Sequence, residues 1–354
     1  MLITKEEFIG VMMIGIRVDA NNEIATGHVM RCLSIAFGIK KADKECFFIT
    51  ADENAKEILA PYGFEVICLN SQWNDLNKET EKLVEVIREF NIDKLIIDSY
   101  FVTPQYLKRL MIYTKVIYID DMNFFKYPVS MVINYNSYYE IFLYPVIYAN
   151  TETELLLGCE FAPLREEFSL VKPLYRNKVK KVLISTGGTD KFNLAGKLLN
   201  GIKEKKLFRG IEFHVVVGTL NPNFGYLLNL SDRNVSIVLH KNVKSMSKLM
   251  ISCDIAITAG GSTMYELCAC GIPTICFSFA DNQLYGVRKF ANDGIMAYAG
   301  DIRDSEGRCI LNLIDYIEEY IRNANERKKK SVRMRKKVDG NGVKRIVKAI
   351  IDLC

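Results

Sequence analysis

The sequence predicts an α/β protein of two doubly wound, Rossmann-type domains, and three observations lead to this fold class. The chain has 354 residues, whereas a single domain usually has about 100–200. Short β-branched runs alternate with longer amphipathic segments, a pattern typical of parallel sheets covered by helices. The alternation stops in a proline-containing stretch, residues 138–177, and then resumes, which indicates an interdomain connection.

The first domain is expected at residues 1–165 and the second at 166–354. In the first we expect strands at 13–18, 46–51, 66–69, 94–98, 115–120 and 131–134, with helices at 27–41, 54–62, 80–90 and 104–113. In the second we expect strands at 180–185, 212–217, 235–239, 255–259 and 274–277, with helices between them. A helical tail from about residue 311 is interrupted at Gly340-Asn341-Gly342.

Composition and charge exclude several classes of protein. Hydrophobic residues make up 49% and charged residues 25%, which allows a core in each domain. The net charge of +5 is mild and comes largely from the basic run 327–337, which we interpret as a solvated helix face. No basic residues cluster with aromatics along one element, so we expect no nucleic-acid partner.

The ten cysteines show no zinc-site spacing and mostly lie in apolar runs, which favours free thiols in a reducing compartment. Residues 1–11 show no signal-peptide pattern, and no apolar stretch reaches the roughly 18 residues of a membrane span. We therefore expect a soluble, cytoplasmic protein without membrane insertion.

Ligands in open α/β sheets bind beyond the carboxyl ends of the strands, so two such domains predict a binding cleft between them. The loop 19–28 follows the first strand and ends in Gly27-His28 at the start of a helix. A helix N-terminus favours a neutral imidazole, which a general base needs. We therefore predict that His28 is the catalytic base. Asp19 either orients the imidazole or attacking water, or simply stabilises a turn.

Two glycine-rich loops in the second domain predict an anion site. Gly187, Gly188 and Thr189 follow the strand 180–185, and a Gly-Gly turn either forms an anion-binding concavity or is only structural. Gly261, Ser262 and Thr263 follow the strand 255–259 at a helix start, where backbone N–H groups suit a diphosphate.

Glu266, on the same helix, could accept both ribose hydroxyls, as the acidic residue of dinucleotide folds does. The alternatives are a Ser262 or Thr263 cap and a capping box of Thr263 with Glu266. After the strand 274–277, Asn282 and Gln283 offer carboxamides to a sugar or phosphate, or form a plain turn.

Taken in order, these segments resemble the PseG-type UDP-sugar hydrolases of pseudaminic acid biosynthesis, which are related to SpsG-like spore-coat polysaccharide proteins and MurG-like enzymes of the GT-B fold. The resemblance covers most of the chain from Met13 on. The matching segments are 16–19 with 23–24, 27–28 and 31–33, then 95–100, 119–121, 134–136, 156–158, 161–168, 187–190, 259–266 and 339–342.

The resemblance implies a GT-B-like fold and hydrolysis of UDP-2,4-diacetamido-2,4,6-trideoxy-β-L-altropyranose to UDP and the free sugar, with inversion and with His28 activating water. It implies no metal or other cofactor, and we expect a monomer or weak homodimer. Glu266 would bind the ribose, and the backbone near Met246 would read uracil. The residues expected to contact the sugar are Gly27, Arg31, Asp98, Tyr100, Asn134, Asn136, Arg165, Asn282 and Gln283. Ser99 stands where many members of the family have histidine.

Two other functions stay open. A glycosyltransferase of the GT-B fold, acting in surface or spore-coat polysaccharide synthesis, would use the same UDP-sugar donor site. The first domain shows a polar, His-bearing loop and no apolar patch for a lipid acceptor, which favours hydrolysis. A catalytically silent sugar-nucleotide-binding protein would bind UDP without needing His28.

Overall fold

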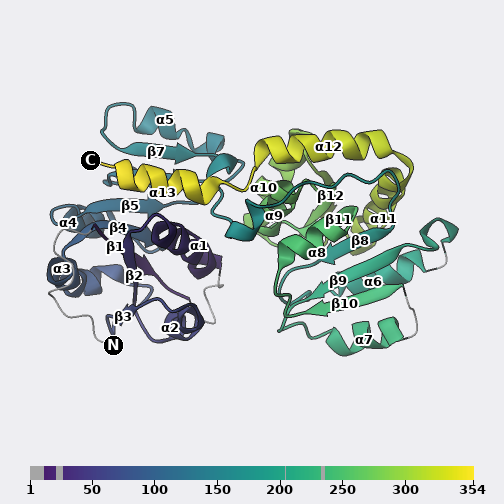
Figure 1. Ribbon diagram of the computed structural model, residues 1–354, viewed down its shortest axis with the longest axis horizontal. Coiled ribbons are helices and arrows are strands. Elements are labelled where there is room, and N and C mark those ends of the chain that lie inside the picture. Colours follow the sequence, from purple (N-terminus) through teal and green to yellow (C-terminus); the bar gives the residue numbers. More distant parts are fainter. Residues whose placement is uncertain (1–11, 21–26, 204, 233–235) are drawn as a thin grey trace. The chain divides into compact units, whose positions relative to one another are not determined.

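The computed structural model describes residues 12–20, 27–203, 205–232 and 236–354, and the chain divides into two compact units (Figure 1). Unit 1 comprises Met1–Arg165 and Asn341–Cys354, and unit 2 comprises Glu166–Gly340. Each unit has its own parallel sheet with helices on both faces. The prediction of two doubly wound domains is therefore confirmed.

Within the described residues, the sheet of unit 1 has seven strands in the order β3-β2-β1-β4-β5-β6-β7. The strand order reverses between β1 and β4, and in open α/β sheets such a switch point is where ligands bind. The strands are β1 (Met13–Val18), β2 (Glu45–Thr50), β3 (Val66–Cys68), β4 (Ile92–Asp98), β5 (Lys115–Ile119), β6 (Met131–Asn134) and β7 (Glu154–Leu157).

Side chains alternate between the two faces of this sheet, and a separate hydrophobic core lies on each face. In β4, Ile96 packs into one core while Leu95 and Ile97 pack into the other, as the two-residue period of a strand requires. The first core includes α1 (Gly27–Lys41), α2 (Asn54–Leu59) and α13 (Gly342–Asp352). The second includes α3 (Thr80–Glu89), α4 (Pro104–Leu110) and α5 (Tyr144–Ile147). Short 3-10 helices lie at Ala60–Tyr62, Leu76–Glu79, Tyr139–Phe142, Cys159–Phe161 and Glu166–Phe168.

The predicted connection 138–177 is only partly a linker, and this expectation was wrong for its first half. Glu154–Leu157 forms β7, which pairs with β6 and extends the sheet. The run is short and lies at the sheet edge, so it shows no alternation that would distinguish it from a loop. Unit 1 runs to Arg165 before the chain enters unit 2.

The C-terminal helix α13 belongs to unit 1, although the prediction placed residues 341–354 in the second domain. Ile346, Val347 and Ile350 are buried in the same core as α1, and α13 runs beside α1 in Figure 1. The buried Lys94 Nζ donates to the carbonyls of Ile350 and Ile351 at 2.6 and 2.9 Å, which satisfies two end carbonyls of the helix.

In unit 2 the described residues form a six-stranded sheet in the order β10-β9-β8-β11-β12-β13, with the same kind of switch point between β8 and β11. The strands are β8 (Lys181–Ser185), β9 (Glu212–Val217), β10 (Ile237–Lys241), β11 (Ile255–Ala259), β12 (Thr274–Ser278) and β13 (Ala297–Asp301). The prediction omitted β13. It began the strand β10 at residue 235, which lies outside the described residues.

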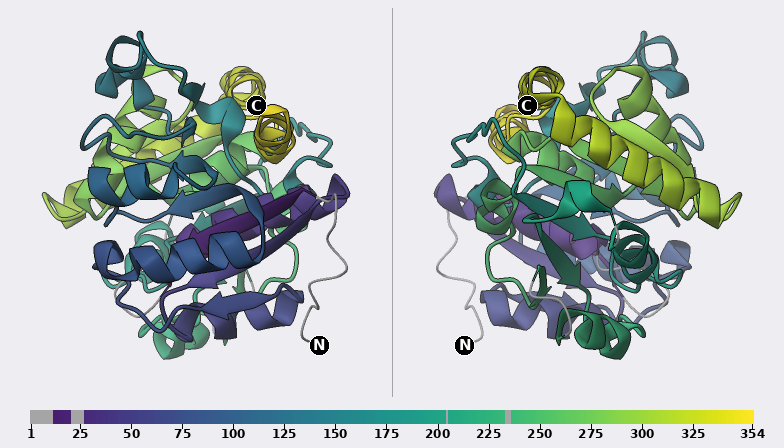
Figure 2. Two further views of the ribbon diagram at one scale, coloured as in Figure 1. Left: turned by 90° about the vertical axis from the view of Figure 1, so that its left-hand side faces the viewer. Right: turned by 90° about the vertical axis from the view of Figure 1, so that its right-hand side faces the viewer.

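The helices of unit 2 are α6 (Leu194–Ile202), α7 (Phe224–Asp232), α8 (Met246–Ser252), α9 (Thr263–Cys270), α10 (Asp281–Asn292), α11 (Glu306–Arg322) and α12 (Ala324–Lys337), with a 3-10 helix at Lys206–Phe208. Helices α6 and α11 pack into one core with the sheet. The right-hand view of Figure 2 shows α11 crossing this face. On the other side of the sheet α12 lies against α9.

The basic run 327–337 forms α12, but it is more than a solvated face. Arg327 is fully buried and donates to the carbonyls of Arg176 and Asn177 at 3.1 and 2.7 Å and to that of Tyr320. Its guanidinium thus joins the start of unit 2 to the end of α11. The periodicity of charge could not reveal this, because a buried and an exposed arginine look the same in sequence.

Replacing Ile346 by alanine should destabilise unit 1 by about 2–5 kcal/mol, because it removes a fully buried side chain from the core shared with α1. The fluorescence of Trp73, the only tryptophan and a residue of unit 1, reports the unfolding of this unit in urea. Lys348→Ala, on the exposed side of α13, is the control and should leave the midpoint unchanged. An unchanged midpoint for Ile346→Ala would show that α13 does not stabilise unit 1.

Candidate functional site

Five polar residues of unit 1 meet at the carboxyl ends of its central strands. His28 and Arg31 lie in the first turns of α1, which follows β1. Asp98 is the last residue of β4, Asp121 follows β5, and Asn136 follows β6. The cluster therefore spans the switch point between β1 and β4.

His28 is held by Asp98. The imidazole Nδ1 lies 2.5 Å from Asp98 Oδ1, and the side chain of His28 is 13% exposed. Burial alone would raise the pKa of Asp98, but the positive charge of Arg31 and the hydrogen bonds from Arg31 and His28 outweigh it, so the pKa lies well below its usual value. An ionised carboxylate can only accept, so Nδ1 carries the proton. In the neutral imidazole this leaves the lone pair on Nε2.

Arg31 is clamped between two carboxylates. Its Nε and one terminal nitrogen donate to Asp98 at 2.6 Å, and both terminal nitrogens donate to Asp121 at 3.0–3.1 Å. The remaining N–H donates to the hydroxyl of Tyr135 at 3.0 Å. A guanidinium has five N–H donors, and protein oxygens accept from all five. Arg31, predicted to bind the sugar, therefore has no donor left for it; its role here is internal.

Asp121 connects the rest of the cluster. Besides Arg31, it accepts from the hydroxyl of Tyr100 and from the carboxamide of Asn136, both at 2.9 Å. The Tyr100 ring meets the imidazole of His28 edge-on at 4.8 Å, and Tyr100 is half exposed. The structure thus brings together five of the predicted residues: His28, Arg31, Asp98, Tyr100 and Asn136. The sequence prediction missed Asp121, although an Asp-Asp pair at a strand end was a usable signal.

Asn134 was predicted to contact the sugar, but its position argues against this. It is fully buried, its Nδ2 donates to Tyr144 at 2.7 Å, and its Oδ1 accepts from the backbone of Asn136 at 3.0 Å. Tyr144 and Tyr127 in turn donate to Asp120. Asn134 therefore shapes the loop that carries Asn136.

Asp19 does not orient His28, which corrects one of the two roles considered for it. Its carboxylate lies 2.5 Å from Arg17 and accepts from the backbone of Ala51 at 2.7 Å. Arg17 also binds Glu79, and all three charged side chains are buried. Asp19 thus fixes the end of β1 to the end of β2. Residues 21–26 of the same loop lie outside the described residues.

The two helix starts of unit 2 at the carboxyl ends of β8 and β11 differ. In the loop after β8, Gly187, Gly188 and Thr189 are exposed, but the next residue, Asp190, turns its carboxylate onto the N-terminus of α6. It accepts from Leu194 N and Ala195 N at 2.9 and 3.2 Å. Because this carboxylate already binds there, α6 is a poor place for a phosphate.

The N-terminus of α9 has no side-chain cap from its N-cap residue, although the N–H groups of Gly261, Met264 and Tyr265 donate to the backbone carbonyls of Ala259, Gly261 and Ser262. Ser262 is its N-cap residue, and its side chain makes no cap hydrogen bond. Thr263 is the first helical residue, so neither predicted cap nor a Thr263–Glu266 capping box is formed. Gly261 and Ser262 are exposed, and Glu266 lies in the first turn. The loop Gly261–Thr263 is therefore the more suitable of the two for an anion.

The other predicted site residues of unit 2 lie in the loop after β12 and at the start of α8. Gln283 Oε1 accepts from the backbone of Phe279 at 2.9 Å and so fixes the loop after β12, whereas Asn282 is exposed. Met246 begins α8, where Glu167 accepts from Ser245 and Ser247 at 2.6–3.2 Å. The two remaining residues belong to unit 1: Arg165 is half-buried at the end of that unit, and Gly27 is exposed at the start of α1.

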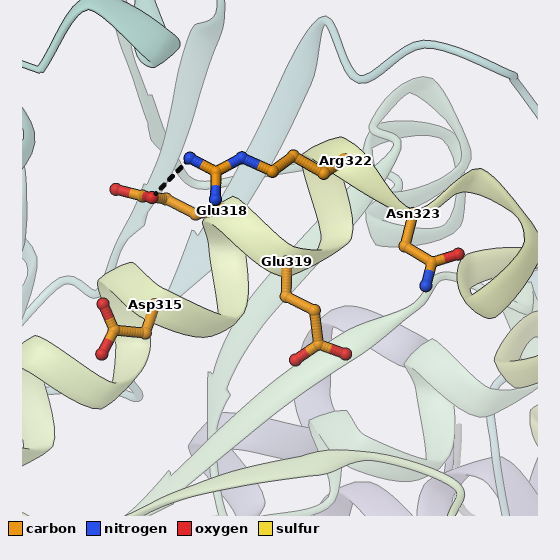
Figure 3. A pocket seen from close by; sticks show the side chains of 5 residues that line it. All are labelled: Asp315, Glu318, Glu319, Arg322 and Asn323. Carbon is orange, nitrogen blue, oxygen red and sulfur yellow. Dashed lines mark hydrogen bonds and ion pairs between the residues drawn. The ribbon is translucent and has the colours of Figure 1, made fainter.

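A surface hollow on α11 is separate from these loops. Figure 3 shows the side chains that line it, and Arg322 pairs there with Glu318 at 3.1 Å. Lys205 binds the same glutamate at 2.7 Å. None of the predicted site residues lines this hollow, which comprises Asp315, Glu318, Glu319, Arg322 and Asn323.

The described part of the chain has neither a cluster of metal-ligand side chains nor a membrane-spanning helix. It contains no group of three or more His, Cys, Asp or Glu side chains placed to hold a metal ion. None of its helices combines the length and apolar character needed to cross a membrane. All ten cysteines are free thiols.

Comparison with known proteins supports the resemblance noted in the sequence. No model of a known protein family matches the chain. It is 23% identical over 270 residues to the UDP-2,4-diacetamido-2,4,6-trideoxy-β-L-altropyranose hydrolase of Campylobacter jejuni, covering 75% of this chain and 92% of that one. It is 23% identical over 290 residues to the spore coat polysaccharide biosynthesis protein SpsG of Bacillus subtilis, covering 80% and 82%. The resemblance to these proteins is confirmed.

The uncharacterized protein MJ1062 of Methanocaldococcus jannaschii is 31% identical over 288 residues, which is 75% of this chain and 55% of that protein. The chain thus spans about half the length of this relative. Among solved structures, MurG of Acinetobacter baumannii superposes with a TM-score of 0.71 at 12% identity, covering 97% of this chain and 99% of that one. At this identity the match shows the fold alone, which is GT-B-like, as the sequence resemblance implied.

Arg31→Met should destabilise unit 1 by roughly 3–5 kcal/mol at pH 7, because it leaves Asp98 and Asp121 buried together without their cation. In the wild type both carboxyl pKa values are below 3.8, so the stabilisation exists above that pH and is lost as the pH falls through the folded-state values. In the variant both pKa values rise, so its deficit should be smaller at pH 5 than at pH 7.

Urea unfolding followed by Trp73 fluorescence at the two pH values measures this difference. Arg109→Met is the matched control, since it removes an exposed arginine paired with Glu81 on the surface of the same unit, and it should change little. A deficit for Arg31→Met that does not depend on pH would contradict the electrostatic account of the clamp.

Proposed function

We propose that this protein hydrolyses a UDP-sugar to UDP and the free sugar, with inversion at the anomeric carbon and with His28 as the general base. The substrate class comes from the named relatives, and UDP-2,4-diacetamido-2,4,6-trideoxy-β-L-altropyranose is the substrate that the Campylobacter relative's name specifies. The observation that carries the proposal is the hydrogen bond between His28 and Asp98, which presents Nε2 as the basic nitrogen.

The proposed step is one displacement. Nε2 of His28 removes a proton from water as the water oxygen bonds to the anomeric carbon. The bond from this carbon to the diphosphate oxygen breaks, and the electron pair leaves with UDP. Attack opposite to the leaving group inverts the anomeric carbon. Asp98 stabilises the imidazolium that forms, as a carboxylate does when it holds a catalytic histidine.

Unit 2 is proposed to bind the nucleotide. The start of α9, which has no side-chain cap, is proposed to bind the diphosphate through Gly261, Ser262 and Thr263, and Glu266 one turn on is proposed to accept the ribose hydroxyls. Because Asp190 already binds the N-terminus of α6, Gly187, Gly188 and Thr189 are not proposed to hold the phosphates. Met246, at the start of α8, remains the proposed position for reading uracil.

Incubation with UDP-2,4-diacetamido-2,4,6-trideoxy-β-L-altropyranose in ¹⁸O-labelled water should release UDP without an acceptor and place the label on the sugar. His28→Ala should lower kcat by about 10²–10⁴-fold with a smaller change in KM, and Asp98→Asn should lower kcat as well because the imidazole loses its partner. Product release by chromatography, mass spectrometry of the label and NMR of the first-formed anomer measure these outcomes.

His240→Ala, which removes a half-exposed imidazole from unit 2, is the control and should retain turnover. Release of UDP only when a sugar or lipid acceptor is added would instead show a glycosyltransferase. Binding of UDP with no turnover and no effect of His28→Ala would indicate a sugar-nucleotide-binding protein.

Glu266→Ala should weaken the binding of UDP by about 1–3 kcal/mol, because the ribose hydroxyls lose their acceptor. Calorimetric titration with UDP measures the affinity. Glu319→Ala, an exposed glutamate of α11, serves as the control for loss of one negative charge from unit 2. Equal affinities of the Glu266→Ala protein and the wild type would refute the ribose assignment.

A further inference from the structure

Among the described residues, the cluster around His28 holds two carboxylates, Asp98 and Asp121, and one guanidinium, Arg31. Asp98 and Asp121 are ionised at neutral pH, and Arg31 is the cation that both of them bind. With a neutral imidazole, the three charged side chains therefore sum to one negative charge. We call these three residues the Asp98–Arg31–Asp121 clamp.

Arg31 on its own opposes the protonation of His28. One of its terminal nitrogens lies 3.1 Å from His28 Nδ1, and both nitrogens bear protons, so this is a contact between two donors and not a hydrogen bond. An imidazolium at this position would meet the guanidinium charge at short range. Asp98 offsets this directly, because it binds both side chains with the same oxygen.

Asp121 offsets the remaining positive charge of Arg31 from the side of the guanidinium that faces away from His28. It binds both terminal nitrogens of Arg31, at 3.1 and 3.0 Å, and it is almost completely buried, so water screens its charge little. The other groups against it are neutral: the hydroxyl of Tyr100 and the carboxamide of Asn136. Tyr100 also supplies the ring edge at His28, and Tyr135 accepts from Arg31.

We propose that Asp121 is a positioning residue that sets the proton affinity of His28 through Arg31. Although Asp121 lies behind Arg31, it offsets the guanidinium charge that would oppose the imidazolium formed when His28 takes a proton from water. Asp121 also keeps Arg31 from drawing Asp98 away from the imidazole. This role rests on the proposed function of His28 as general base.

The test is a titration of the His28 imidazole by NMR, assigned by loss of its signal in His28→Gln among the three histidines. Asp121→Asn should lower the titration midpoint by about one pH unit, the size expected for losing a charge at this range in partly screened surroundings. Arg31→Met should raise it, because the clamp then loses its cation. Asn136→Ala breaks a neutral contact to Asp121 and should leave the midpoint unchanged.

Trp73 fluorescence verifies that each variant is folded, and if Arg31→Met fails to fold, the isosteric Asp121→Asn alone decides. An unchanged or raised midpoint in folded Asp121→Asn overturns the proposal. The acidic limb of the pH profile of kcat/KM should differ between the wild type and Asp121→Asn. The size of this difference should equal the difference between their NMR titration midpoints for His28. Because the titration needs no turnover, a wild type without hydrolase activity would refute the proposed function separately from the role of Asp121.

Discussion

One carboxylate organises the chemistry of unit 1. Asp98, at the end of the central strand β4, binds His28 and Arg31 at once, and both lie one turn apart on α1. A buried carboxylate is costly unless it is paired, so its position requires both partners. Since β4 and β1 are neighbours across the switch point, the sheet itself sets the spacing between Asp98 and the start of α1. The orientation of the imidazole follows from this arrangement.

At the carboxyl ends of the strands of unit 2, two loops that look alike in sequence have different structures. Both contain Gly-Gly followed by a hydroxyl residue after a buried strand. Asp190 closes the first by binding the N–H groups of α6, whereas the second leaves α9 without a side-chain cap. The distribution of charge along the edge, rather than the glycines, distinguishes a structural turn from a proposed phosphate site.

The polar residues near the cluster form layers with different tasks. Asn134, Tyr144 and Asp120 are buried and bind each other, so they shape the loops after β5 and β6. Asp121 lies one residue beyond Asp120 and belongs to the Asp98–Arg31–Asp121 clamp. Asn136 lies two residues beyond Asn134 and donates to Asp121. Near a strand end, a difference of one or two positions in the sequence therefore decides whether a polar residue supports the loop or belongs to the site.

The sequence by itself determined the two sheets, most strand and helix positions and the candidate base His28, because these depend on local periodicity and on the ends of strands. It did not determine that α13 returns to unit 1 or that Glu154–Leu157 joins the sheet, since both depend on packing against distant residues. It also left open whether Asp19 orients His28 or stabilises a turn, and the carboxylate that binds His28 is that of Asp98, 70 residues away. Only the tertiary structure decides which carboxylate meets which cation, because such pairs form between strand ends that the sheet, not the sequence, makes neighbours.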